Sequence, residues 1–216
     1  MKGLLVKDFK LLKGQSRFFG MIIALAILFA FVFEPQFLFT YIGYMLSLFT
    51  ISTISYDEYD NGYPFLFTLP ISRKEYVVEK FLFALIMIIV TIVISLVLYS
   101  GAMVLKNLSL TLDMIYYIIS NILTICMLVA IMLPLQLKFG SEKGRIAISG
   151  AIGIIIVLGI VFVKIAPILN FDLKAMVDSI FSINGMSLLL GAMALVIAMV
   201  LISMMFSIKI MEAKEF

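Results

Sequence analysis

The residues that could do chemistry in this chain are few, and their types limit the possible reactions. The 216-residue sequence contains no histidine and one cysteine, Cys126, which lies inside a long apolar stretch. Without histidine, Ser-His-Asp triads, histidine-ligated zinc and the commonest general base are excluded. A single cysteine allows neither a disulfide framework nor a Cys-rich metal site. Serine, tyrosine and carboxylates are the only remaining candidates for catalysis.

The sequence offers little support for an enzyme. Candidates for an intramembrane hydrolase or acyltransferase are Ser47, Asn121 and Ser203, and none is paired in sequence with a base. Such side chains more often support helix packing or line a pathway. No lysine is followed by Ser or Thr, so the chain has no Walker A loop. We therefore expect no ATPase activity, no metal and no cofactor bound by this chain.

The composition is that of an integral membrane protein. Hydrophobic residues make up 64% of the chain and charged residues 13%, and the mean hydropathy is +1.21. Apolar segments long enough to cross a hydrocarbon core consume most of the length and leave no room for a soluble domain. The sequence therefore predicts an all-α protein with a single membrane domain over residues 1–216. Its six predicted spans are residues 18–33, 37–56, 81–104, 114–137, 146–163 and 187–208.

The lysines and arginines predict the orientation of these spans. With six spans, Lys106, Lys164 and Lys174 lie on one side of the membrane and every other Lys and Arg lies on the opposite side. Because positive charges stay preferentially in the cytoplasm, both termini are expected there. The sequence thus predicts a multi-pass membrane protein.

Residues 1–17 are expected to form an amphipathic helix at the membrane interface, and not a cleaved signal peptide, because no small-residue cleavage site follows the apolar run. Wound as a helix, residues 4–13 separate an apolar arc from a lysine arc, with Val6 and Asp8 as imperfections. Alternatively, the lysines only enforce topology. The apolar arc is Leu4, Leu5, Phe9, Leu11 and Leu12, and the lysine arc is Lys7, Lys10 and Lys13.

The segment over residues 57–80 has the composition of an ordered loop. Gly62, Pro64 and Pro70 interrupt any continuation of the second span, which predicts a short surface helix over residues 59–68. Ser72 and Glu75 then have the spacing of a capping box. The third membrane helix is therefore expected to begin near Ser72, well before its apolar part. An ordinary connecting loop is the alternative.

This segment resembles the first cytoplasmic loop of ABC-2 type transporter permeases. The resemblance rests on Asp57-Glu58, Gly62, the run Leu69-Pro70-Ile71-Ser72-Arg73, and Lys80 at the foot of an apolar helix. Asp57 departs slightly from the family, which often has a second Glu there. The resemblance implies that separate cytoplasmic ATPase subunits bind the ATP and press on this coupling loop. The implied ATPase-coupling residues are Asp57, Glu58, Gly62, Pro70, Ser72, Arg73 and Lys80.

The resemblance also implies a second permease copy or a paralogue as a partner, and the bacterial plasma membrane as the location. The lipid bilayer is then the other surrounding, and no nucleic acid is expected to bind. The function implied is the membrane subunit of an ATP-binding-cassette exporter, with a peptide or toxin as the favoured cargo. A drug or antimicrobial-peptide resistance protein, or an immunity protein that moves nothing, is the alternative. The predicted spans carry no ionisable groups except at their ends, which disfavours ion coupling.

Hydroxyl groups on the second span mark it as the candidate for the pathway and for the contact between two copies. The candidate lining residues form a partial stripe, and an uncharged lining favours amphipathic or lipophilic cargo. They are Thr40, Tyr44, Ser47 and Ser55. The fifth span lacks such groups and is expected to face lipid or pack tightly.

Two further features concern the last spans. Ser187, Gly191, Ala194 and Ala198 recur at helical spacing on the sixth span and predict a seam for close helix packing. Between the fifth and sixth spans, residues 164–186 are expected to include an amphipathic helix on the outer leaflet, with Asp172 as its cap.

Overall fold

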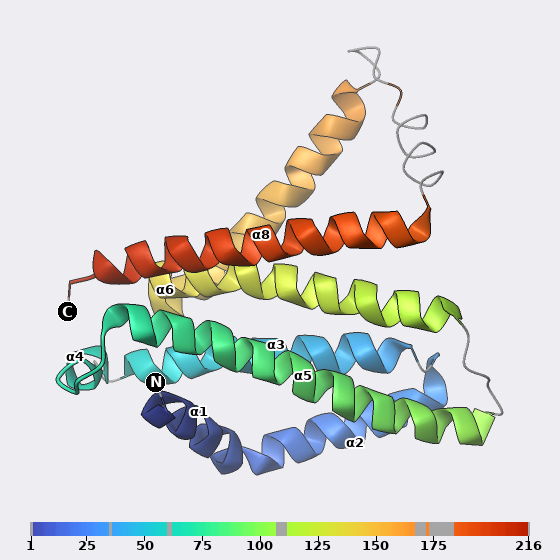
Figure 1. The fold of residues 1–216 in the computed structure, drawn as a ribbon, viewed down its shortest axis with the longest axis horizontal. Coiled ribbons are helices and arrows are strands. Elements are labelled where there is room, and N and C mark those ends of the chain that lie inside the picture. Colours follow the sequence, from blue (N-terminus) through green and yellow to red (C-terminus); the bar gives the residue numbers. More distant parts are fainter. Residues whose placement is uncertain are drawn as a thin grey trace.

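The computed structural model describes residues 2–34, 36–59, 62–106, 112–166, 172 and 184–215. Every secondary-structure element in these ranges is a helix, which confirms the predicted all-α class. Figure 1 shows most of them packed side by side in an elongated bundle. The helices are α1 (Lys2–Gly14), α2 (Ser16–Val32), α3 (Phe37–Glu58), α4 (Gly62–Leu66), α5 (Arg73–Lys106), α6 (Leu112–Ile165) and α8 (Gly185–Glu212).

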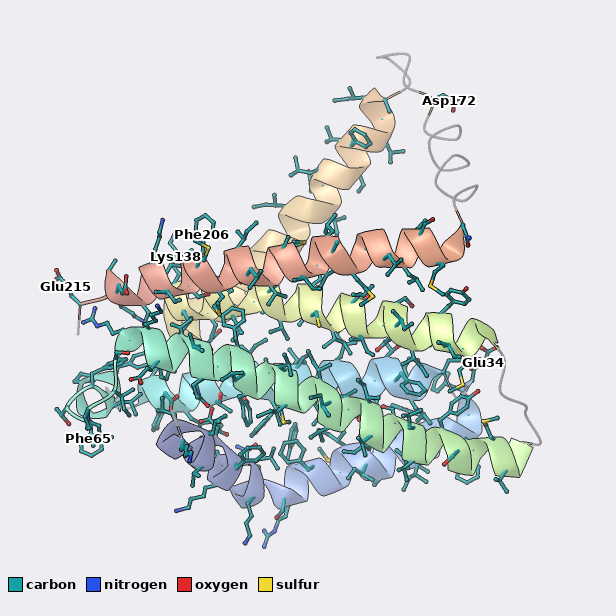
Figure 2. The ribbon with its side chains drawn as sticks, viewed as in Figure 1. Glu34, Phe65, Lys138, Asp172, Phe206 and Glu215 are labelled. Atoms are coloured by element: carbon teal, nitrogen blue, oxygen red, sulfur yellow. The ribbon has the colours of Figure 1, made fainter. Side chains whose placement is uncertain are left out.

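Helix α3 lies at the centre of the bundle and packs against α2, α5 and α6, whereas α8 packs against α6 and α5. The chain ends and α4 lie together at one end of the bundle in Figure 1, and the connection near Glu34 lies at the other end in Figure 2. We call the first of these the α4 end. Because consecutive long helices are antiparallel, short connections suffice between them.

Among the described residues, four helices are long and apolar enough to cross a membrane: Phe37–Glu58, Arg73–Val104, Met114–Gly140 and Gly185–Glu212. Helices α1 and α2 meet at an angle of 65° and qualify as a fifth span only when taken together. The structure thus supports a multi-pass membrane protein with four to five candidate spans in its described part. Six spans, the side of the membrane that each terminus faces, and an interfacial position of α1 stay predictions.

The fourth and fifth predicted spans belong to one helical run, α6, which is broken at Gly140. This residue has φ 75° and ψ −175°, a backbone conformation that is almost exclusive to glycine. Beyond the break, α6 leaves the bundle at an angle (Figure 1). Its described side chains are largely exposed there, including Ile154, Val157 and Phe162. This exposure fits the expected lipid-facing position of the segment.

Burial differs sharply between the spans. In the most apolar window of each span, 61% of α3 is buried inside the bundle, against 11% of α8. Exposed side chains of α8 are large and apolar, as at Leu195, Ile202 and Phe206, and lipid is the solvent that suits such a surface. The predicted small-residue seam also lies on the exposed side of α8, where a Cβ added at Gly191 would meet no atom within 4 Å. It therefore packs against no other helix of this chain in the described residues.

The expected amphipathic helix between the fifth and sixth spans falls almost wholly outside the described residues. Only residues 164–166, 172 and 184–186 of its predicted range are described.

Candidate functional site

Helix α5 begins at Arg73, several residues before its apolar part, because a capping box forms as the sequence predicts. The backbone N–H of Ser72 donates to Glu75 Oε2 at 3.0 Å, and the backbone N–H of Glu75 donates to Ser72 Oγ at 3.1 Å. Ile71 packs against the buried cluster that contains Tyr76 and completes the hydrophobic staple. The first two turns of α5 therefore carry Tyr76 and Lys80 to fixed positions at the α4 end.

Lys80 is the centre of a buried ionic cluster that joins α1, α3 and α5. Its side chain has no exposed surface, and its Nζ lies 2.5 Å from Asp8 Oδ2 and 2.9 Å from Asp57 Oδ2. The same nitrogen donates a hydrogen bond to Thr53 Oγ1 at 3.1 Å. A buried ammonium is stable only when it is paired and hydrogen-bonded in this way. We call Lys7, Asp8, Thr53, Asp57, Tyr76 and Lys80 the Lys80 cluster.

Asp57 accepts contacts from several elements. Its Oδ2 accepts a hydrogen bond from the Tyr76 hydroxyl at 3.0 Å, and Lys7 of α1 forms an ion pair with its Oδ1. Glu79, which is also fully buried, adds a third carboxylate 3.9 Å from Lys80 Nζ. The Lys80 cluster therefore joins α1, α3 and α5 through charged groups that are mostly buried.

Glu58, the next residue, points to the other half of the bundle. Its Oε1 lies 3.5 Å from Lys214 Nζ, and Lys214 also donates to the carbonyl oxygen of Leu137 at 3.3 Å. A Cβ added at Gly140 would lie 2.3 Å from Glu58 Oε1. The break in α6 therefore makes room for the Glu58 carboxylate. The acidic pair thus divides its contacts, Asp57 to α1 and α5, and Glu58 to α6 and the C-terminal segment.

Arg73 ties the start of α5 to the end of α8. Its Nη1 donates to the carbonyl oxygens of Met211, Glu212 and Lys214, at 3.2, 2.7 and 2.6 Å. These carbonyls belong to the last turn of a helix and the residues after it, where no intrahelical N–H is available and a cation is favourable. The arginine of the motif therefore has a structural role in this chain.

Helix α4 packs against the end of α3, and its outer side forms an exposed apolar tip around Phe65. At Gly62, a Cβ would lie 2.5 Å from the carbonyl oxygen of Asp57, so a glycine is needed for this approach. Tyr63 is buried, its ring 5.8 Å from that of Tyr76, and burial raises the pKa of its hydroxyl, which therefore stays neutral. On the outer side Phe65 is 73% exposed, and Figure 2 shows it at the far tip of the bundle.

The exposed surface of the tip continues beyond Phe65. The remaining outward-facing residues are Pro64, Thr68, Leu69 and Pro70. The predicted surface helix is present, but it is shorter than the predicted residues 59–68, because the chain passes into turns after Leu66.

The candidate pathway residues of α3 make contacts within the bundle. Thr40 Oγ1 lies 2.8 Å from the Tyr117 hydroxyl and accepts from Asn121 Nδ2 at 2.7 Å. Ser55 Oγ accepts from Gln136 Nε2 at 3.0 Å. Ser47 is buried and donates to the carbonyl oxygen of Tyr44, itself half-buried. Their role as a lining stays a prediction.

Several residues of the site could not be recognised from the sequence. Asp8 was expected to be an imperfection of an amphipathic helix, yet its side chain is fully buried against Lys80. The available signal was its spacing of four residues from Leu4, which is also buried. Gly140 and Lys214 gave no signal, because their contacts with Glu58 depend on how distant helices pack.

Comparison with known proteins places the chain in a family. No curated protein and no solved structure matched it. A family model described as ABC-2 family transporter protein matches residues 3–212, almost the whole sequence, including residues 57–80 and the helices that hold them. The chain therefore belongs to the ABC-2 transporter family and is a multi-pass membrane component of a transporter, not itself an enzyme.

Proposed function

We propose that this protein is the permease subunit of an ATP-binding-cassette exporter and that its α4 end faces the cytoplasm and binds a separate ATPase subunit. Members of the family normally pair with such ATPases. The single observation that carries the proposal is the exposed apolar tip of α4. This helix follows shortly after Asp57 and Glu58, which form ion pairs with other helices and with the C-terminal segment.

The tip has the features of a docking knob. Phe65 and Leu69 are exposed by 73% and 45%, and an exposed aromatic is a typical anchor of a protein interface. Behind the tip, Tyr63 and Leu66 are buried and pack against α5, so a push on the tip is not absorbed by a loose loop. Asp57 then transmits the force to α1 and α5, and Glu58 transmits it to α6 and the C-terminal segment.

Replacement of Phe65 by Ala tests this docking. In the reconstituted permease and ATPase pair, we expect the variant to lose most of the transport-coupled ATPase activity while its amount in the membrane stays unchanged. The matched control is Phe31→Ala, since Phe31 is a phenylalanine exposed by 62% near the C-terminal end of α2, far from α4. Coupled activity that survives in Phe65→Ala, or is lost equally in Phe31→Ala, would contradict docking at α4.

Charge reversals provide a second test. Glu58→Lys and Arg73→Glu should both uncouple hydrolysis from transport, because each breaks a contact between the coupling segment and the C-terminal residues. If coupled activity survived both changes, transmission through this segment would be wrong. Failure of the ATPase to bind the unmodified permease would instead favour the alternative of a resistance or immunity membrane protein.

The proposal includes a second permease copy or a paralogue and an amphipathic or lipophilic cargo, with a peptide or toxin favoured. Support for pairing comes from the small-residue seam, which this chain leaves exposed on α8. The hydroxyls of Thr40, Tyr44, Ser47 and Ser55 would line the path in a conformation that separates α3 from α6, because two of them bond to α6 here. Transport of a labelled amphipathic peptide by the reconstituted permease and ATPase tests the proposed cargo class.

A further inference from the structure

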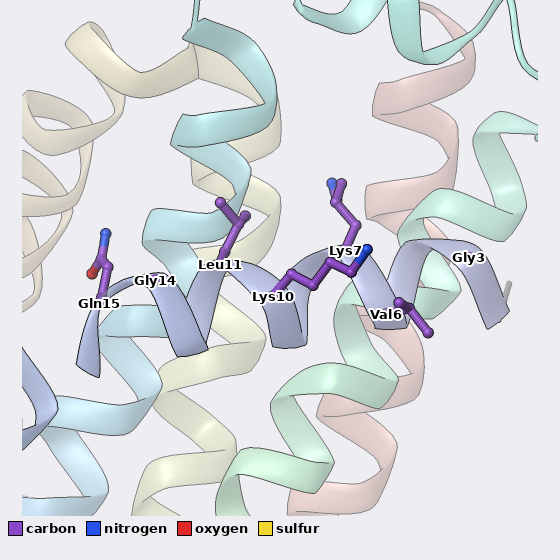
Figure 3. A pocket seen from close by; sticks show the side chains of 7 residues that line it. All are labelled: Gly3, Val6, Lys7, Lys10, Leu11, Gly14 and Gln15. Atoms are coloured by element: carbon purple, nitrogen blue, oxygen red, sulfur yellow. The ribbon is translucent and has the colours of Figure 1, made fainter.

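Helix α1 carries a groove that the proposed transport function does not use. Its volume is about 510 Å³. Figure 3 shows Lys10 stretched along the helix in the direction of Lys7. The groove is lined by Gly3, Val6, Lys7, Lys10, Leu11, Gly14 and Gln15.

The charge of α1 is strongly one-sided. Lys2, Lys10 and Lys13 are exposed, and within the described residues none of them has an acidic partner. The only acid of the helix, Asp8, is fully buried in the Lys80 cluster and offers nothing to the surface. An anion is therefore the complementary ligand for this face.

The lining also has an apolar part. Val6, 54% exposed, and Leu11 share the groove with the two lysines, and Phe9 on the same helix is 42% exposed. A free phosphate ion would use none of this apolar surface. A phospholipid would use both, since its phosphate can pair with lysine while its glycerol and upper acyl groups lie against Val6 and Leu11.

We propose that this groove binds the headgroup of an anionic phospholipid, with Lys10 as the main phosphate contact and Lys7 as the second. Lys7 also pairs with Asp57 and lies 3.3 Å from Asp8 Oδ1, so the bound headgroup shares this lysine with the Lys80 cluster. The proposal does not depend on an ATPase partner. It identifies α1 as a lipid-binding element rather than only a topology signal.

Two glycines of the groove border open space. A Cβ added at Gly3 or at Gly14 would meet no atom within 4 Å. A leucine at Gly14 therefore enters the groove without displacing protein, and leucine is a better helix former than glycine. Gly14→Leu is thus a blocking variant that leaves every charge in place.

The test is native mass spectrometry of the full chain in a neutral detergent, titrated with dihexanoyl phosphatidylglycerol. This short-chain lipid presents no charged membrane surface, so a bound molecule reports a site. We expect saturable binding of one lipid, with little binding of dihexanoyl phosphatidylcholine. Lys10→Gln should weaken binding about fivefold, the factor for one lysine at about 1 kcal/mol, and Gly14→Leu should weaken it at least as much.

The matched controls are Lys13→Gln and Gly20→Leu. Lys13 is an exposed lysine of the same helix that does not line the groove, and a Cβ at Gly20 also meets open space. Both variants should bind within twofold of the unmodified protein. Equal loss in Lys13→Gln, binding unaffected by Gly14→Leu, equal binding of the phosphatidylcholine, or displacement by an equimolar amount of inorganic phosphate would each overturn the proposal.

Discussion

At the scale of single residues, the Lys80 cluster shows how a charge can be stable at the end of an apolar helix. Lys80 precedes a long apolar run and its side chain is fully buried, so its ammonium cannot reach water. Two carboxylates and a threonine hydroxyl replace the lost hydration. Because these contacts join three helices, the cluster also fixes the positions of the helices relative to one another.

Lys80→Met should therefore be strongly destabilising. The change leaves Asp8 and Asp57 buried without their main cation, a situation that costs about 3–5 kcal/mol. Unfolding by sodium dodecyl sulfate, followed by circular dichroism, measures the free energy. Lys74→Met is the control, because Lys74 is an exposed lysine in the first turn of the same helix. Neutralising the stranded acid in Lys80→Met with Asp8→Asn should recover part of the loss, and no recovery would mean that the lysine acts through packing alone.

At the scale of elements, the break in α6 depends on one glycine. Gly140 adopts a backbone conformation that other residues avoid, and the side of the break faces the Glu58 carboxylate. A helix-breaking proline is not the cause, because Pro134 lies inside the helical run before the break. The direction of residues 141–165 is therefore set at a single position.

Gly140→Ala is expected to destabilise the protein by about 1–3 kcal/mol from its backbone conformation. The added Cβ would also displace Glu58 from its position near Lys214. The same detergent unfolding measures the loss, and Gly150→Ala is the control, since a Cβ there meets open space within a regular helix. Equal stability of the two variants would contradict the role given to Gly140.

Elements determined by neighbouring residues could be predicted from the sequence, and those determined by packing could not. The capping box needed only Ser72 and Glu75, which are three residues apart, and it formed as predicted. Continuous apolar segments located the long helices to within a few residues at most ends. The burial of Asp8 and the contact between Glu58 and Lys214 required the positions of distant helices, for which one sequence carries no direct signal.

At the scale of the whole molecule, the bundle is arranged with its polar spans inside and its apolar spans outside. Helix α3 carries the most hydroxyls and is the most enclosed, whereas α8 is apolar almost all round and is the most exposed. This is the arrangement that a bilayer favours, because hydroxyls find partners only within the protein.

The absence of tryptophan allows a direct test of this arrangement. A single tryptophan at Phe206→Trp on α8 should be strongly quenched by brominated phospholipids, because Phe206 is 61% exposed. Phe49→Trp on α3, where the native ring is 3% exposed, should be quenched little. Similar quenching at the two positions would show that α3 faces lipid and that the bundle is packed differently.

Pairing of two copies can be located by disulfide cross-linking in a Cys126→Ala background. Ala194→Cys lies on the exposed seam of α8, and Thr40→Cys lies on the predicted interface along α3. Because α3 is enclosed by three helices of its own chain, we expect intermolecular disulfides at Ala194 rather than at Thr40. Dimers at Thr40 alone would restore α3 as the contact, and no dimers at either position in a transporting assembly would exclude both helices.

The ties of Arg73 and Glu58 to the C-terminal segment have a consequence for biogenesis. Arg73 and Lys214 are 141 residues apart in sequence, and Glu58 and Lys214 are 156 apart, whereas Lys80 and Asp8 are only 72 apart. A ribosome therefore releases Asp8 and Lys80 before it releases the C-terminal residues that contact Arg73 and Glu58. Until then these two charges lack the carbonyls and the ammonium that hold them in the finished protein. A chain that stalls before residue 211 would therefore carry both charges at the α4 end without these contacts.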